Sequence, residues 1–185
     1  MIFVIILVIL AAVAFLGISG YNSLISMKNK VGEASSDIDV QLKRRYDLIP
    51  NLVSTVKGSS NFESETLEKV IQARNAAQSI SGLGADKIAA ENQLTGALRQ
   101  VFALSESYPD LKSNANYLQL QGELTNTEDR ILSARRFYNQ VVSDYNTMQD
   151  AFPTMFFKGM AGATKAPFFE LENPAVEREN VKVSF

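Results

Sequence analysis

The chain has 185 residues, of which 46% are apolar, and its 18 basic and 20 acidic residues give a net charge of -2. A balance this close to neutral gives no electrostatic reason to expect nucleic acid as a partner. Cysteine and histidine are both absent, which excludes disulfides, thiol nucleophiles, and imidazole as a general base or metal ligand.

The first twenty residues predict a membrane anchor. No charged side chain precedes Lys28, and residues 2–18 are an almost unbroken run of Ile, Val, Leu, Phe and Ala. As a helix, such a run can cross about 30 Å of hydrocarbon. Gly17 and Ser19 have the small-residue spacing of a signal-peptide cleavage site, but the run is too long and lacks a basic n-region. We therefore assign residues 1–20 as a transmembrane helix in contact with the lipid bilayer.

The charges next to this segment predict its orientation. Lys28 and Lys30 follow it and nothing basic precedes it. The positive-inside rule then predicts a single-pass protein with its N-terminus outside and its C-terminal domain in the cytoplasm. Two lysines are a small excess, so the alternative is a C-terminal domain outside the cell.

Residues 21–57 predict a long helix that could continue from the anchor. Pro50 lies inside the pattern and predicts a kink near Tyr46 or Asp47, and Gly58 predicts the end of the helix. The apolar positions recur at intervals of seven, four and three, as one face of a helix requires. They are Leu24, Val31, Ile38, Leu42, Ile49, Val53 and Val56.

Two shorter helices are predicted at residues 61–80 and 86–107. Ser60 and Glu63 have the S-x-x-E spacing of a capping box before the first of them. The run Ser-Gly-Leu-Gly at 81–84 separates the two.

The last predicted helix, residues 113–149, has the clearest amphipathic pattern. Its apolar positions alternate in steps of three and four from Tyr117 to Met148, the spacing of a coiled-coil seam, and Pro153 lies just beyond its end. Together the four ranges predict an all-α fold: an antiparallel up-down four-helix bundle over residues 21–150, with long first and last helices. The alternative is three long helices, the middle one broken at Gly82.

Residues 151–185 predict an irregular, Phe-rich C-terminal tail. Regular apolar spacing ends at Pro153, yet five phenylalanines lie between Phe152 and Phe169. In an up-down bundle the last helix returns toward the membrane, which would bring Phe156, Phe157 and Lys158 near the interface. The alternative is that these rings cap the open end of the bundle.

The polar residues suggest no reaction. A di-iron carboxylate bundle needs Glu-x-x-His motifs, which a chain without histidine lacks. Glu123 and Glu128 lie off the apolar seam and predict a solvated face, and Asp37 and Asp39 point to different faces of a helix. No P-loop, dinucleotide-binding turn or EF-hand spacing occurs. We assign no catalytic, cofactor-binding or metal-ligating residues and expect no enzyme and no cofactor.

Two polar clusters allow more than one interpretation. We interpret them as solvated basic faces whose side-chain stems lie along apolar surface. The alternatives are arginines that bond acidic groups across the bundle, or, for the first cluster, attraction to anionic lipid. The first cluster is Lys43, Arg44, Arg45 and Asp47, and the second is Arg135, Arg136, Asn139 and Asp144.

Four stretches carry a family resemblance: "YNSLISMKNKV", "SDIDVQLKRRYDLIPNLVSTVKG", "SYPDLKSNANYLQLQGELTNTEDRILSARRFYNQVVSDYN" and the "FP" after the last predicted helix. With them the chain from Tyr21 to Phe185 resembles the LemA family of bacterial membrane proteins. The resemblance implies an N-terminal transmembrane helix, an antiparallel four-helix domain in the cytoplasm and a short N-terminus outside. It implies no catalytic residues. Tyr46 stands where many relatives are expected to have histidine, which argues against a role that needs imidazole there.

These observations predict a membrane-anchored helical scaffold or interaction protein. Its expected partners are the bilayer, through residues 1–20, further copies of itself, and an unidentified membrane or cytoplasmic protein. The alternative is an extracytoplasmic helical-bundle sensor that binds a small ligand between its helices.

Overall fold

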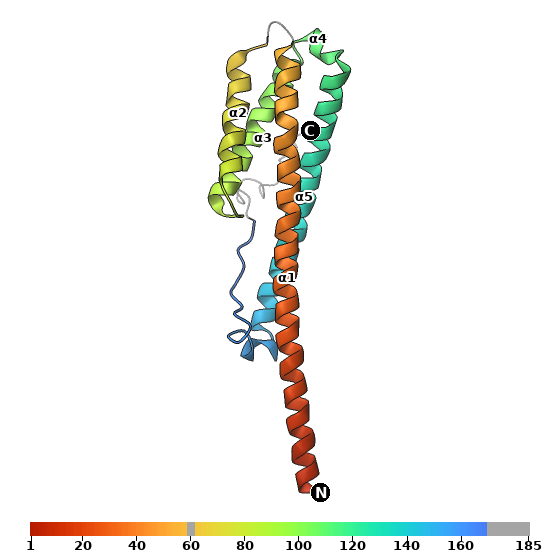
Figure 1. Cartoon of the computed structure of the whole chain (residues 1–185), viewed down its shortest axis with the longest axis vertical. Helices are drawn as coiled ribbons and strands as arrows, with labels where there is room; N and C mark the ends of the chain where they lie inside the picture. The colour runs from red at the N-terminus through yellow and green to blue at the C-terminus, as the bar shows by residue number, and fades with distance from the viewer. Residues whose placement is uncertain (59–61, 170–185) are drawn as a thin grey trace, which may run out of the picture. The chain divides into compact units, whose positions relative to one another are not determined.

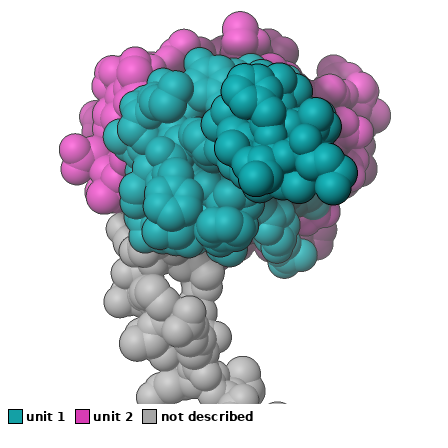
Figure 2. All heavy atoms as spheres, turned by 90° about the horizontal axis from the view of Figure 1, so that it is seen from below, with its two compact units in different colours: residues 1–38, 133–168 teal, residues 39–132, 169–185 magenta. Residues whose placement is uncertain are grey.

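The computed structural model describes residues 1–58 and 62–169, and over these residues it contains helices and no strand (Figure 1). The predicted all-α class is therefore confirmed. The chain divides into two compact units, distinguished by colour in Figure 2. Unit 1 comprises residues 1–38 and 133–168, and unit 2 comprises residues 39–132 together with Phe169 among the described residues. The elements are α1 (Ile2–Lys57), α2 (Ser64–Ser79), α3 (Ala85–Ser105), α4 (Pro109–Lys112), α5 (Ala115–Asp150) and the 3-10 helix η1 (Thr154–Phe156).

Helix α1 joins the predicted anchor and the first long predicted helix into one element. It is not interrupted at Gly20 or at Pro50. Its first part is apolar all round: an 18-residue window reaches a mean hydropathy of 3.1 and none of it is buried. A helix of this length and composition can cross a membrane.

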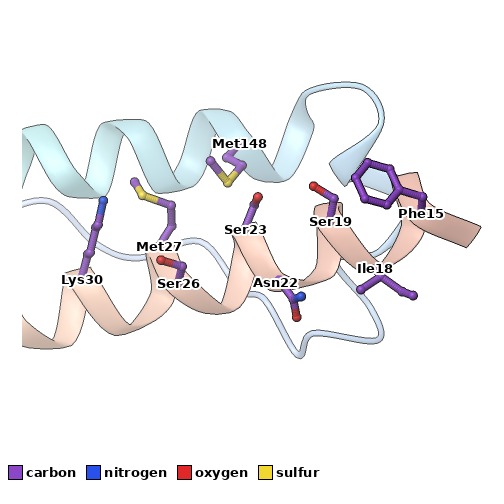
Figure 3. Close-up of a pocket in the computed structure, with 9 residues that line it drawn as sticks. All are labelled: Phe15, Ile18, Ser19, Asn22, Ser23, Ser26, Met27, Lys30 and Met148. Carbon is purple, nitrogen blue, oxygen red and sulfur yellow. The ribbon is translucent and has the colours of Figure 1, made fainter.

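In unit 1 the end of α5 lies beside α1, with Met148 facing Ser23 (Figure 3). The described part of the predicted tail is held by hydrogen bonds between its backbone and side chains of α5. Asn146 donates to the carbonyl of Ala166 and accepts from its N–H, both at 2.9 Å. The hydroxyl of Tyr138 donates to the carbonyl of Pro167 at 3.0 Å. Residues 170–185 of the predicted tail lie outside the described residues.

In unit 2 the predicted break at residues 81–84 separates α2 from α3, and the two helices pack side by side (Figure 1). Gly82 has a φ of +82°, a left-handed conformation that side chains rarely adopt. The antiparallel order of four helices stays a prediction. The buried apolar side chains of this unit include Leu42, Ile49, Leu52, Val56, Leu67, Val70, Leu94, Leu98, Val101, Leu111, Tyr117, Leu124 and Ile131.

Two helix starts differ from the sequence-based expectation. Helix α2 begins at Ser64 rather than at residue 61, with Glu63 at its N-cap and no side-chain cap. Glu63 instead accepts a hydrogen bond from Thr66 at 3.3 Å, and Ser60 lies outside the described residues. Helix α5 begins at Ala115 because Asn114 caps it, its side-chain oxygen accepting from the N–H of residues 116 and 117.

The short helix α4 is not predicted by the sequence pattern. Pro109 opens it, where the fixed φ of proline suits a first helical position, and Asp110 lies in its first turn. Burial of Leu111 holds this turn on unit 2. The pattern misses it because one helical turn contributes a single buried apolar residue and hence no periodicity.

Candidate functional site

The most unusual polar group of unit 2 is Arg45 of α1, a residue that is 0% exposed. It donates to acceptors on two other helices. One terminal nitrogen, Nη2, bonds Glu91 of α3. The other, Nη1, bonds Glu128 of α5 at 2.6 Å and Thr95 of α3 at 3.0 Å. A planar guanidinium can make such divergent bonds at once, and here it joins α1, α3 and α5.

Glu91 is the centre of this network and is fully buried. While one of its oxygens bonds Arg45, the other accepts from the hydroxyl of Tyr46 and lies 3.3 Å from Nζ of Lys87. Lys87 also donates to the Tyr46 oxygen at 2.9 Å and to the carbonyl of Ala77 at 2.7 Å. Each buried charge therefore meets more than one partner.

The charges within the network balance, because Arg45 and Lys87 face the two carboxylates of Glu91 and Glu128. Burial of a charge that faces an opposite charge costs far less than burial of an unpaired ion. Burial, followed by the hydrogen bond to the Glu91 carboxylate, raises the pKa of Tyr46 well above its ordinary value of 10.0. Tyr46 is thus kept as a neutral phenol that donates to Glu91.

Helix α2 is tied to the same place through a backbone group. Arg74 donates from Nε to the carbonyl of Tyr46 at 2.8 Å. The sequence explains why this carbonyl is free: Pro50, four residues further on, has no N–H to donate to it. Four helices, α1, α2, α3 and α5, therefore converge on residues 45 and 46.

The predicted solvated face at residues 43–47 is only partly correct. Lys43 and Asp47 are exposed and pair with each other at 2.8 Å. Arg44 is exposed and lies 3.7 Å from Glu123 of α5. For Arg45 the prediction is wrong and the alternative of an arginine bonded across helices holds. One turn of a helix carries side chains to different environments, and Arg45 lies on the inward one.

The structure also places the other acids and arginines that the sequence singles out. Glu128 was expected on a solvated face but bonds Arg45, whereas Asp37 and Asp39 are exposed. In the second cluster Arg135 is buried while Arg136 is exposed. The described residues contain no group of three or more Asp or Glu side chains placed to hold a metal ion.

The sequence does contain a signal for the burial of Arg45, Lys87 and Glu91. Arg45 falls in the apolar series of α1, three residues after Leu42 and four before Ile49. Glu91 likewise falls three residues before Leu94 and is spaced for a helical pair with Lys87. A charged residue at an apolar seam position is a candidate for burial with a partner.

A small cavity adjoins the network in unit 2. Its volume is about 200 Å³. Apolar side chains of α3 and α5 form part of the wall, and charged groups and two threonines form the rest. The lining residues are Arg45, Thr95, Leu98, Arg99, Phe102, Leu124, Thr125, Glu128 and Asp129.

Over the residues that the structure describes, fold and site define a class: an all-helical protein with an N-terminal apolar helix able to cross a membrane and an ion-paired helical unit. Residues 34–185 match the LemA family. The chain belongs to the LemA family, which confirms the resemblance read from the sequence.

Individual relatives agree with this assignment. Protein LemA of Metamycoplasma hominis is 32% identical over 136 aligned residues, which cover 72% of this chain and 61% of the relative. Magnetosome protein MamQ 2 of Paramagnetospirillum magneticum is 24% identical over 194 aligned residues, which cover 90% of this chain and 71% of the relative. Magnetosome protein MamQ of Magnetospirillum gryphiswaldense is 23% identical with the same coverage. These similarities support a membrane-associated protein of the LemA type.

Proposed function

We propose that this protein is a non-enzymatic, membrane-anchored scaffold that acts by binding, and that it assembles with further copies of itself. The observation that carries the proposal is a pair of adjoining surface hollows on unit 2. One follows α1 and holds about 460 Å³, and the other lies between α1 and α5 and holds about 470 Å³. They share Leu48 and Asn51 in their walls, and we treat the two together as one shallow surface groove, which we call the α1/α5 groove.

The α1/α5 groove suits a second copy of the same surface. Val40, 62% exposed, and Leu48 supply apolar area. Both signs of charge line it, with Lys43 and Arg44 on α1 and Glu123 on α5. A surface with apolar area and both charges can be complementary to itself across a two-fold axis, as an isologous dimer requires.

The buried network supports binding rather than catalysis. Arg45 and Lys87 are held by carboxylates and carbonyls of the protein, and Tyr46 is kept neutral. A general acid or base needs a pKa near the working pH and access to substrate. We infer that the network fixes the packing of four helices and thereby the shape of the α1/α5 groove.

Introduced cysteines test self-assembly, because the native chain contains none. In isolated membranes, Asn51→Cys is expected to form a disulfide-linked dimer on mild oxidation, since this exposed position lies where the two hollows meet, and a two-fold axis through the groove brings positions near the axis next to their own copies. Gln72→Cys, exposed on α2 and outside the groove, is the control and should stay monomeric. Equal amounts of disulfide-linked dimer from both variants would contradict self-assembly. So would the absence of linked dimer from both variants, if the chain is also monomeric in mild detergent.

We place the N-terminus outside the cell and the C-terminal domain in the cytoplasm, on the charges of Lys28 and Lys30. Protease added to intact cells tests this, because a cytoplasmic domain stays protected until the membrane is opened.

The second candidate is an extracytoplasmic sensor, and the cavity beside Arg45 favours it. Its volume of about 200 Å³ and its mixed apolar and charged wall suit a small polar ligand. Digestion of the domain from outside the cell would favour this candidate over the first.

A further inference from the structure

The turn that follows α5, residues 151–162, exposes large apolar side chains. Among the described residues beyond the N-terminal segment, the three most exposed large apolar side chains are Phe152 at 79%, Met160 at 76% and Phe156 at 66%. Phe152 and Phe156 lie together, with ring centroids 6.1 Å apart and ring planes at 89°. Clustered exposure of this kind marks an interaction surface.

The turn is held in this conformation by its own backbone. The N–H of Met155 donates to the carbonyl of Ala151 at 2.8 Å, and that of Ala161 donates to the carbonyl of Phe157 at 3.0 Å. The apolar side chains are therefore presented by an ordered segment rather than by a loose end.

Asp150, the last residue of α5, closes the turn. Its carboxylate lies 3.0 Å from Nζ of Lys165 and 3.7 Å from Nζ of Lys158. The hydrogen bond from Lys165, followed by the positive charge of that lysine, lowers the pKa of Asp150. Lys158 and Lys165 lie next to the apolar side chains of the turn, where their ammonium groups can interact with anionic lipid headgroups.

The turn is seated on the end of the apolar part of α1, within unit 1. The ring of Phe157 lies so close to α1 that a Cβ added at Gly20 would be 3.0 Å from it and one at Gly17 would be 3.3 Å from it. These two glycines are what allows the ring to reach the helix backbone.

The contact between Phe157 and α1 fixes the position of the turn along that helix. Residues 2–20 as a helix span roughly 28 Å, close to the thickness of the hydrocarbon core. Ser19 brings the first polar side chain, and Ser19 and Ser23 both lie on the side of α1 that faces Met148 (Figure 3). Further along, Lys28 donates to the carbonyl of Gly162 at 3.3 Å. The turn therefore follows α1 from the end of its apolar run to its first charge.

We propose that residues 152–160 insert into the interface of the phospholipid bilayer that α1 enters, with Phe152, Phe156 and Met160 in contact with lipid. In addition to the anchor, the turn makes a second contact with the membrane, at its interface, and holds the C-terminal end of α5 against the bilayer. The bilayer is the occupant because Phe157 and Met160 line one apolar hollow together with Ala14 and Ile18 of α1, so the surface is continuous with the apolar segment of that helix. This inference rests on the proposed anchor.

The test uses tryptophan fluorescence, because the native chain contains no tryptophan. The full chain is reconstituted in phosphatidylcholine and phosphatidylglycerol vesicles as Phe156→Trp. The matched control is Phe137→Trp on α5, which is similarly exposed at 57% but lies thirteen residues, about 20 Å of helix, before Asp150. Lipids brominated near the headgroup end of their acyl chains serve as quenchers.

The expected result is blue-shifted emission from Phe156→Trp, at least twofold quenched by the brominated lipid, with water-like and unquenched emission from Phe137→Trp. Equal quenching of the two variants overturns the inference. So does a blue shift at position 156 without quenching, which would place the turn against protein instead. Resistance of the reconstituted chain to carbonate extraction reports on the anchor separately, and release of the chain would overturn both proposals.

Discussion

Arg74 makes the hydrogen bond that Pro50 cannot make. Proline at position 50 leaves the carbonyl of Tyr46 without its helical donor, and Nε of Arg74 donates to that carbonyl at 2.8 Å. A position that normally weakens a helix thereby becomes the point where α2 is attached to α1. The same residue, Tyr46, donates its hydroxyl to the buried Glu91, so backbone and side chain are fixed at one place.

The first prediction concerns this bond. Arg74→Leu should lower the free energy of unfolding by about 1–3 kcal/mol, because it leaves a carbonyl without a partner. In a Pro50→Ala background the N–H of residue 50 can donate to the carbonyl of Tyr46. Arg74→Leu should then lower the free energy of unfolding by less than it does in the native chain. Denaturant unfolding of the full chain in mild detergent measures both. Arg130→Leu, exposed on α5, is the matched control, and strict additivity of the two changes would contradict the argument.

The second prediction concerns the buried ion pairs. Arg45→Met should destabilise the chain by about 3–5 kcal/mol, because Glu91 then stays buried without its arginine. Arg44→Met alters an exposed pair on the adjacent residue and should change stability by less than about 1 kcal/mol. Thermal and denaturant unfolding compare the two variants. A similar loss from both would mean that Arg45 is solvated, as the charge pattern of the sequence predicts.

The third prediction concerns alkaline pH. Folding raises the pKa of Tyr46 above 10.0, its ordinary value. The neutral phenol therefore contributes its full share to the free energy of unfolding below about pH 10. That stability is lost as pH rises further, because the unfolded chain releases the proton first. Tyr46→Phe should therefore make the loss of stability above pH 10 shallower. Unfolding midpoints across this range test it, with Tyr108→Phe as control and an unchanged slope as the contrary result.

The fourth prediction concerns the segment after the turn. Asn146→Asp removes the side-chain donor to the carbonyl of Ala166, a loss of about 1 kcal/mol. Local opening should rise roughly fivefold, and tryptic cleavage after the exposed Lys165 should accelerate to match. Asn126→Asp, exposed elsewhere on α5, should leave the cleavage rate unchanged. No difference between the two variants would show that the segment is held by other contacts.

Local pattern was sufficient for the helices and the apolar segment. Hydropathy over residues 2–18 and the spacing of apolar side chains depend only on neighbours in the chain, and the helices lie where these patterns occur. The pattern misses α4 because a single helical turn is too short to show a repeat of apolar positions. The family is recognisable because its similarity lies in continuous stretches of sequence.

The site could not be read in the same way. Arg45 is separated by 46 residues from Glu91 and by 83 from Glu128, and only packing decides that these groups meet. By itself the sequence determined that this protein is helical, apolar at its start and of the LemA type. The tertiary structure alone decided that Arg45 is buried rather than solvated, and that Phe157 lies against Gly17 and Gly20. Secondary structure follows from short-range periodicity, whereas a buried charge is stable only where distant parts of the chain bring it a partner.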